Sequence, residues 1–195
     1  MVSTEAVRGC AGRGWVATAI GPGAAHRPDR IRAHEDQERE MTAPTHPAEP
    51  RTRAQRRRDT EHRLAHDVDV WVASAAPDGT PYLVPLSFSW DGAAVWVATP
   101  AGSPTGRNLA ATGAARLALG PTRDVTVIDG VVEVFELDAL PREHGDRFAA
   151  RAGFDPRGAA GPYRWFRITP RRILAWREVN ELKGRELMRD GRWLD

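Results

Sequence analysis

The feature that most constrains the fold of this chain is a strict alternation of large apolar residues with small or polar ones. It is clearest in one run where the apolar side chains are Tyr82, Val84, Leu86, Phe88 and Trp90. Successive side chains of a β-strand point to opposite faces, so this spacing predicts a strand with one face in the core. Asp91-Gly92 follows, a pair typical of tight hairpin turns. We therefore expect antiparallel strands.

Five other segments after residue 67 also have strand character. They run from Val68 to the turn at 77–80, and over 93–99, 114–119, 125–137 and 163–179. Asp129-Gly130 suggests a bulge in the fifth strand, and Pro170 suggests a break in the sixth. Helices are predicted at 104–112, between the cap Ser103-Pro104 and the stop Gly113, and at 141–152. Six strands with few helices favour a small, mainly β barrel that closes its sheet edges.

The remaining sequence divides into two parts. Residues 1–50 carry Gly, Pro, Ala and charge in no period and are expected to be disordered, with Met41 as a hypothetical true start. Residues 51–66 are expected to form a basic helix, and 67–195 the barrel domain with a C-terminal extension. The arginine run 51–58 is interpreted as a solvated helix face, with a polyanion-binding patch as the weaker alternative.

Charge and length exclude several classes of protein. Of the net charge of +2 among 195 residues, residues 1–66 contribute +3 and the rest −1, so no nucleic-acid partner is expected for the barrel. No apolar run approaches the roughly 20 residues that span a bilayer, so no membrane partner is expected. No secretory signal is recognisable, and a cytoplasmic location is predicted.

The residue inventory also excludes much chemistry. Cys10 is the only cysteine, and His144 is the only histidine after residue 66, so the barrel can hold neither a Cys/His zinc site nor a Cys-His nucleophile. The usual serine-hydrolase, phosphate-loop and dinucleotide motifs are absent. We therefore predict no catalytic side chain and no metal site, and expect any chemistry to belong to a bound cofactor. His144, Tyr82 and Tyr163 are conceivable proton donors to which we assign no role.

The segment 99–108 leaves a strand and enters a helix, where backbone N–H groups and the helix dipole favour anions. Ser103 and Thr105 add hydroxyls, Gly106 allows close approach, and Arg107 adds a cation. The segment is a candidate phosphate cradle, although a capped connector with a solvated arginine explains the same residues.

Pro85 cannot donate to a sheet ladder, so it indicates an edge, a bulge or a neighbouring ligand. Ser87 and Ser89 lie on the same face and would leave room for a flat ring. A solvent-exposed face accounts for these residues equally well.

These segments resemble a known family. The runs V-x-V-A-S-A-x-P-D-G-x-P-Y-L-V-P-L-S-F, W-V-A-T-P-x-x-S-P-T-G-R-N-L and L-A-L-G-P-T-R-D-V-T between residues 70 and 126 are similar to the pyridoxamine 5'-phosphate oxidase-like FMN-binding proteins, in particular their flavin- and deazaflavin-dependent oxidoreductase group. The resemblance covers roughly residues 60–180. It implies a six-stranded antiparallel split β-barrel and a homodimer with FMN or coenzyme F-420 in a cleft between protomers.

The resemblance also assigns residues to that cofactor. The phosphate side would be formed by Thr99, Ser103, Thr105, Arg107 and Asn108, and the ring side by Val84, Pro85, Leu86 and Ser87. Many relatives carry a lysine at the position of Thr105, so one positive charge is missing here. The founding enzymes close the site with Trp and Arg from the partner's C-terminal part, for which the candidates are Trp176, Arg177, Arg185 and Trp193.

The implied activity is hydride transfer between the bound flavin or deazaflavin and a small organic substrate. A binding or sequestering protein with the same barrel and no turnover is the alternative, since one fold hosts several functions.

Overall fold

The structure is a computed structural model that describes residues 49–195. The expected tail over 1–50 and its candidate start at Met41 lie outside these residues, apart from the last two positions. Residues 49–195 belong to one compact unit, and in them β-strands predominate and three α-helices accompany the strands.

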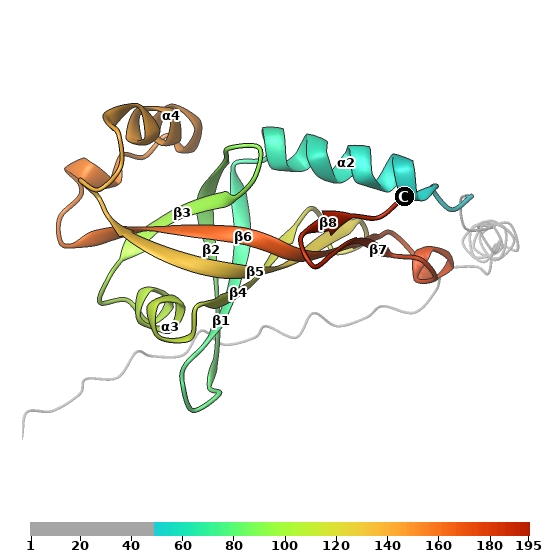
Figure 1. Cartoon of the computed structure of the whole chain (residues 1–195), viewed down its shortest axis with the longest axis horizontal. Helices are drawn as coiled ribbons and strands as arrows, with labels where there is room; N and C mark the ends of the chain where they lie inside the picture. The colour runs from blue at the N-terminus through green and yellow to red at the C-terminus, as the bar shows by residue number, and fades with distance from the viewer. Residues whose placement is uncertain (1–48) are drawn as a thin grey trace, which may run out of the picture. The chain divides into compact units, whose positions relative to one another are not determined.

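Six strands close into a barrel (Figure 1). They are β1 (Asp69–Ala75), β2 (Pro81–Trp90), β3 (Val95–Pro100), β4 (Ala114–Leu119), β5 (Val125–Glu136) and β6 (Tyr163–Trp176). The strand order is β3-β2-β1-β4-β5-β6, every pair is antiparallel, and pairing of β3 with β6 closes the ring. The predicted mainly β, six-stranded antiparallel barrel is confirmed.

The sixth strand differs from its prediction in two ways. Pro170 does not break β6, because it lies opposite Gly130 where the register of β5 shifts at the predicted bulge between Asp129 and Gly130. A proline is tolerated at such a point, where the ladder is already interrupted. β6 also ends at Trp176 rather than 179, and the short η2 (Val179–Glu181) follows.

Two short strands extend the sheet beyond the barrel. β7 (Glu186–Arg189) pairs with the end of β6, and β8 (Arg192–Trp193) pairs with β7. The sequence analysis assigned this region only as a C-terminal extension. Strands of four and two residues are too short for alternation to reveal them.

Three α-helices flank the barrel. α2 (Arg53–His66) begins with a capping box between Thr52 and Gln55, and it runs beside β7, β8 and the C-terminus (Figure 1). α3 (Pro104–Thr112) has the predicted bounds, with Ser103 as its N-cap and Gly113 in the left-handed conformation at its end. α4 (Arg142–Ala152) is followed by η1 (Pro156–Gly158).

The buried apolar residues form two clusters. The main one fills the barrel, while the smaller one lies between α4 and the strands β3 and β6, around Trp96, Phe148 and Trp165. On β2 the predicted core face holds only for the second half of the strand: Phe88 is fully buried, whereas Tyr82 is 40% exposed. The first half belongs to the β1–β2 hairpin, whose tip extends past the residues of β1 that pair with β4.

Candidate functional site

Two segments that the sequence analysis singled out separately line one cavity. Pro85, Leu86 and Ser87 of β2 face Thr99 and Pro100 at the end of β3, around a volume of about 210 Å³. Ala98, Phe148, Phe154 and Tyr163 complete the lining. The candidate cofactor cavity, as we call it, is thus bounded by two strands and by the segment that carries α4.

The β2–β3 hairpin explains why these residues meet. Phe88 pairs with Val97, and both side chains are fully buried in the barrel core. Because side chains alternate along a strand, Ser87 and Ala98 point to the opposite face. The cavity therefore lies on the outside of the barrel wall, where α4 covers it through Phe148.

Ser103 connects this cavity to the start of α3. Its hydroxyl accepts a hydrogen bond from the backbone N–H of Gly106 at 3.0 Å and lies 3.2 Å from the hydroxyl of Thr99. Gly106 itself is close to backbone, since a Cβ there would lie 2.4 Å from the carbonyl oxygen of Pro100. The tight fit of α3 against the end of β3 places the Ser103 and Thr99 hydroxyls side by side.

Of the residues predicted on the phosphate side, only Thr99 lines the cavity, and Ser103, Thr105, Arg107 and Asn108 lie outside the lining. Arg107 is exposed, and its guanidinium donates to the carbonyl of Gly102. Thr105 and Asn108 are buried, and the Asn108 side-chain amide donates to the Ser74 hydroxyl at 3.3 Å, which ties α3 to β1. Val84, on β2, also lies outside the lining.

The cavity lining contains no charged residue. Among its residues only Tyr163, Ser87 and Thr99 carry hydroxyl protons, and the rest are apolar. Pro100 belongs to the segment proposed as a phosphate cradle, whereas Ala98, Phe148 and Phe154 were not anticipated from sequence. Nothing in the spacing of a loop residue such as Phe154 indicates which strand it will meet. Such a lining can bind a flat apolar ring and hydrogen-bond to its edge, but it offers no strong acid or base.

His144 lies next to the cavity wall but not in it. Its ring contacts those of Trp96 and Trp165, with centroids 4.4 and 4.9 Å apart, and its Nε2 atom is buried with no hydrogen-bond partner within the described part of the chain. Burial lowers the pKa of His144, the positive charge of Arg147 lowers it further, and Asp91 opposes both. The lowered pKa favours the neutral form of the His144 ring, which packs against the aromatic residues of the smaller cluster.

Arginines of the basic segment before the barrel bind groups of the same chain. Arg51 forms ion pairs with Asp59, Asp124 and Glu181, and Arg56 is buried and donates to the carbonyls of Glu181 and Gly184. The expectation of a solvated face is therefore wrong for these two residues. They attach the start of α2 to the C-terminal segment around η2.

The C-terminal candidates likewise contact groups of their own chain. The Arg185 guanidinium lies 5.1 Å from the centre of the Trp176 ring, and that of Arg57 lies 4.6 Å from the centre of the Trp193 ring. The Nε atom of Arg177 is 3.1 Å from a carboxylate oxygen of Asp124.

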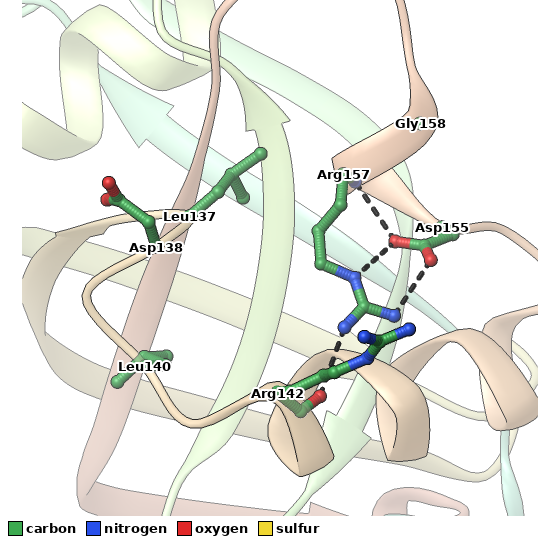
Figure 2. A pocket seen from close by; sticks show the side chains of 7 residues that line it. All are labelled: Leu137, Asp138, Leu140, Arg142, Asp155, Arg157 and Gly158. Atoms are coloured by element: carbon green, nitrogen blue, oxygen red, sulfur yellow. Dashed lines mark hydrogen bonds and ion pairs between the residues drawn. The ribbon is translucent and has the colours of Figure 1, made fainter.

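A second cavity, of about 490 Å³, lies where α4 begins and η1 passes it (Figure 2). Arg157 forms a two-point ion pair with Asp155, a further one with Asp146, and donates to the carbonyl of Arg142. Its guanidinium donors are thus engaged in holding η1 to α4. None of the predicted cofactor residues lines this cavity.

The described residues contain no group of three or more His, Cys, Asp or Glu placed to hold a metal ion. Within residues 49–195, no helix has the length and apolar character needed to cross a membrane.

The fold and cavity define a closed six-strand barrel protein with a small, mainly apolar cavity on the outside of its wall. A family model described as Pyridoxamine 5'-phosphate oxidase matches residues 61–177, more than half of the chain. The chain belongs to this family. No curated protein matches the sequence.

Solved structures share the barrel at low sequence identity. A protein from Clostridium acetobutylicum related to general stress protein 26 of B. subtilis (pyridoxinephosphate oxidase family) is 14% identical, with a TM-score of 0.51 over 66% of this chain and 92% of that one. The protein Atu2129, of unknown function, from Agrobacterium tumefaciens is 15% identical, with a TM-score of 0.51 over 63% of this chain and 56% of that one. An F420 reductase is 20% identical, with a TM-score of 0.48 over 58% of this chain and 94% of that one. At these identities the likeness concerns the fold alone.

Proposed function

We propose that this protein binds FMN or coenzyme F-420 and is an oxidoreductase that transfers a hydride between the cofactor and a small organic substrate. The observation that carries the proposal is the candidate cofactor cavity, because Pro85, Leu86 and Ser87 meet Thr99 and Pro100 there. The family resemblance assigned the ring and the phosphate tail to these two segments. Membership of the pyridoxamine 5'-phosphate oxidase family supports the assignment.

The donor set suits a flavin-type cofactor. The apolar walls and the Ser87 hydroxyl would accept a flat ring, and the hydroxyls of Thr99 and Ser103 would donate to a phosphate. Arg107 is exposed beside them and would turn from the Gly102 carbonyl to the phosphate. When bound, the cofactor supplies the hydride chemistry, and the protein contributes orientation and a partly dry surface.

The proposal includes a homodimer. A cavity of about 210 Å³ is smaller than the roughly 300–1,000 Å³ typical of ligand pockets, so one chain provides only part of a site. On the same outer side of β1 and β2, Trp71 is 50% and Leu83 is 58% exposed, and Trp71 pairs with Pro85 of the cavity. A second copy that covers these apolar side chains would supply the missing wall.

Binding is tested by the absorption spectrum of the purified protein and by titration with FMN and with F-420. Arg107→Ala should weaken binding of the preferred cofactor by about 1.5–3 kcal/mol, the usual contribution of a hydrogen bond to a charged group. Arg58→Ala removes another exposed charge, from α2, and serves as the matched control. Equal binding by wild type and Arg107→Ala would remove Arg107 from the site.

Turnover distinguishes the enzyme from the alternative, a binding or sequestering protein. The near-absence of acid or base groups in the cavity suits both roles, so the cofactor-loaded protein should be assayed with electron donors and acceptors of several classes. Consumption of more than one equivalent per cofactor supports the oxidoreductase, and a single equivalent supports sequestration.

The dimer is tested separately by light scattering after size exclusion. Leu83→Glu places a charge on the exposed apolar face and should convert a dimer to monomers that bind the cofactor at least tenfold more weakly. A wild-type protein that is monomeric while binding cofactor tightly would contradict the shared site.

A further inference from the structure

A groove of about 430 Å³ lies at the opposite end of the β2–β3 hairpin from the candidate cofactor cavity. It is bounded by the turn after Trp90, by the middle of β6 and by the β7–β8 hairpin. No residue lines both hollows. We call it the Trp90–Trp193 groove after the two indole rings in its lining.

The apolar part of this groove is held in place by the main core. Trp90 and Trp193 are half-buried and pack against the barrel cluster, and Met188 beside them is 6% exposed. The Arg57 guanidinium lies over the Trp193 ring and helps to fix it. Indole rings that are fixed but only partly covered leave flat apolar surface available to a ligand ring.

Two arginines supply the polar part of the groove. Most arginines of the barrel are in ion pairs, but Arg171 and Arg192 are exposed and make no ion pair or side-chain hydrogen bond with any residue in 49–195. The one acidic residue of the lining is Asp190. The groove therefore has an excess of positive charge next to its rings.

The β7–β8 turn is rigid, which fixes where these charges lie. Asp190 and Gly191 both have positive φ, of 50° and 75°, as the tightest two-residue hairpin turns require. The backbone N–H of Gly191 donates to the carbonyl of Arg171 at 2.9 Å, so the turn is attached to β6. Arg171 and Arg192 thus flank one firmly held turn.

We propose that the Trp90–Trp193 groove binds a small aromatic compound that carries a phosphate or carboxylate group. The ring lies on the exposed indole surface, and the anion accepts hydrogen bonds from Arg171 and Arg192, whose planar guanidinium groups match the geometry of both anions. The volume is within the range of small-molecule sites. The proposal is independent of the candidate cofactor cavity.

The test measures the binding of phenyl phosphate and benzoate to the full chain by isothermal titration calorimetry. Phenol and inorganic phosphate serve as the ring-only and anion-only probes. We expect phenyl phosphate or benzoate to bind at least tenfold more tightly than either fragment. Arg171→Ala/Arg192→Ala should reduce that affinity at least tenfold, whereas Arg58→Ala/Arg123→Ala, which removes two exposed charges elsewhere, should not.

The indole N–H signals in a ¹⁵N–¹H spectrum locate the binding. Those of Trp90 and Trp193, assigned with Trp90→Phe and Trp193→Phe, should shift on titration, while that of the buried Trp165 stays. A shift confined to Trp165, whose ring packs against Phe148 of the candidate cofactor cavity, would place the compound on that side of the barrel and overturn the proposal. Binding no tighter than that of inorganic phosphate, or unchanged in the double variant, would also overturn it.

Discussion

Arg51 and Glu181 are 130 positions apart in the sequence and form a buried ion pair, with Nη2 and Oε2 2.8 Å apart. The Arg51 backbone N–H donates to the same carboxylate at 2.8 Å, and so does that of Arg177. Glu181 is 2% exposed, so its charge depends on these partners. Arg51 lies two positions before α2, so the pair attaches the segment that precedes this helix to η2, which follows the last barrel strand.

Glu181→Gln should lower the free energy of unfolding by about 3 kcal/mol, because it removes the most buried of the three carboxylates that pair with Arg51. Denaturant unfolding followed by tryptophan fluorescence measures the change. Glu178→Gln removes an exposed carboxylate that pairs with Arg123, and it should change stability by less than about 0.5 kcal/mol. Equal effects of the two substitutions would show that the ion pair contributes little.

Acid should destabilise the protein through the same carboxylate. Hydrogen bonding to Arg51 lowers the pKa of Glu181 to about 2, below its ordinary value of 4.5. A depressed carboxylate pKa stabilises the fold above the unfolded value, and this contribution is lost as the pH falls from about 4.5 toward 2. The unfolding free energy of the wild type should therefore fall more steeply over this window than that of Glu181→Gln. Parallel curves would contradict the assignment.

The parts of the fold that were predictable from sequence are those with local causes. Ser103-Pro104 and Gly113 bound α3 because a cap, a preset φ and a left-handed stop act on adjacent residues. The bulge at Asp129-Gly130 follows in the same way from a glycine in a strand. The predicted break at Pro170 was wrong because a proline is tolerated within β6 only opposite that bulge. The bulge lies 40 positions earlier in the sequence, and the two meet only when β5 and β6 pair.

The candidate site was predictable in part for the same reason. Pro85 and Ser87 were recognised as unusual on their strand, and Thr99 by its place before a capped helix. Their meeting across the hairpin depends on strand pairing, and the cover from Phe148 depends on where α4 packs. Thr105 was placed on the phosphate side as a hydroxyl of the candidate cradle and by the resemblance, and Asn108 by the resemblance alone, whereas the structure buries both.

Mild acid should lower the free energy of unfolding through His144 of α4. Burial lowers the pKa of this histidine below 6.5, so the unfolded chain binds the proton more readily than the folded one. Stability from the neutral ring is present above pH 6.5 and decreases as the pH falls below it. His144→Phe keeps an aromatic ring between Trp96 and Trp165 and should remove this slope between pH 7 and 5. Tryptophan fluorescence along urea unfolding at each pH measures it, and an unchanged slope in His144→Phe would contradict this role of His144.

Gly106→Ala should separate α3 from the end of β3. A Cβ at this position would lie 2.4 Å from the Pro100 carbonyl oxygen, which is backbone and cannot rotate away, so we expect a loss of about 1–3 kcal/mol in stability. Gly102→Ala is the matched control four positions earlier, since its Cβ would have nothing within 4 Å. If the Thr99 and Ser103 hydroxyls hold the cofactor phosphate, Gly106→Ala should also weaken FMN or F-420 binding at least tenfold, while Gly102→Ala leaves it intact. A Gly106→Ala protein as stable as the wild type would show that the start of α3 can move, and the two hydroxyls would then not be held as a preformed pair.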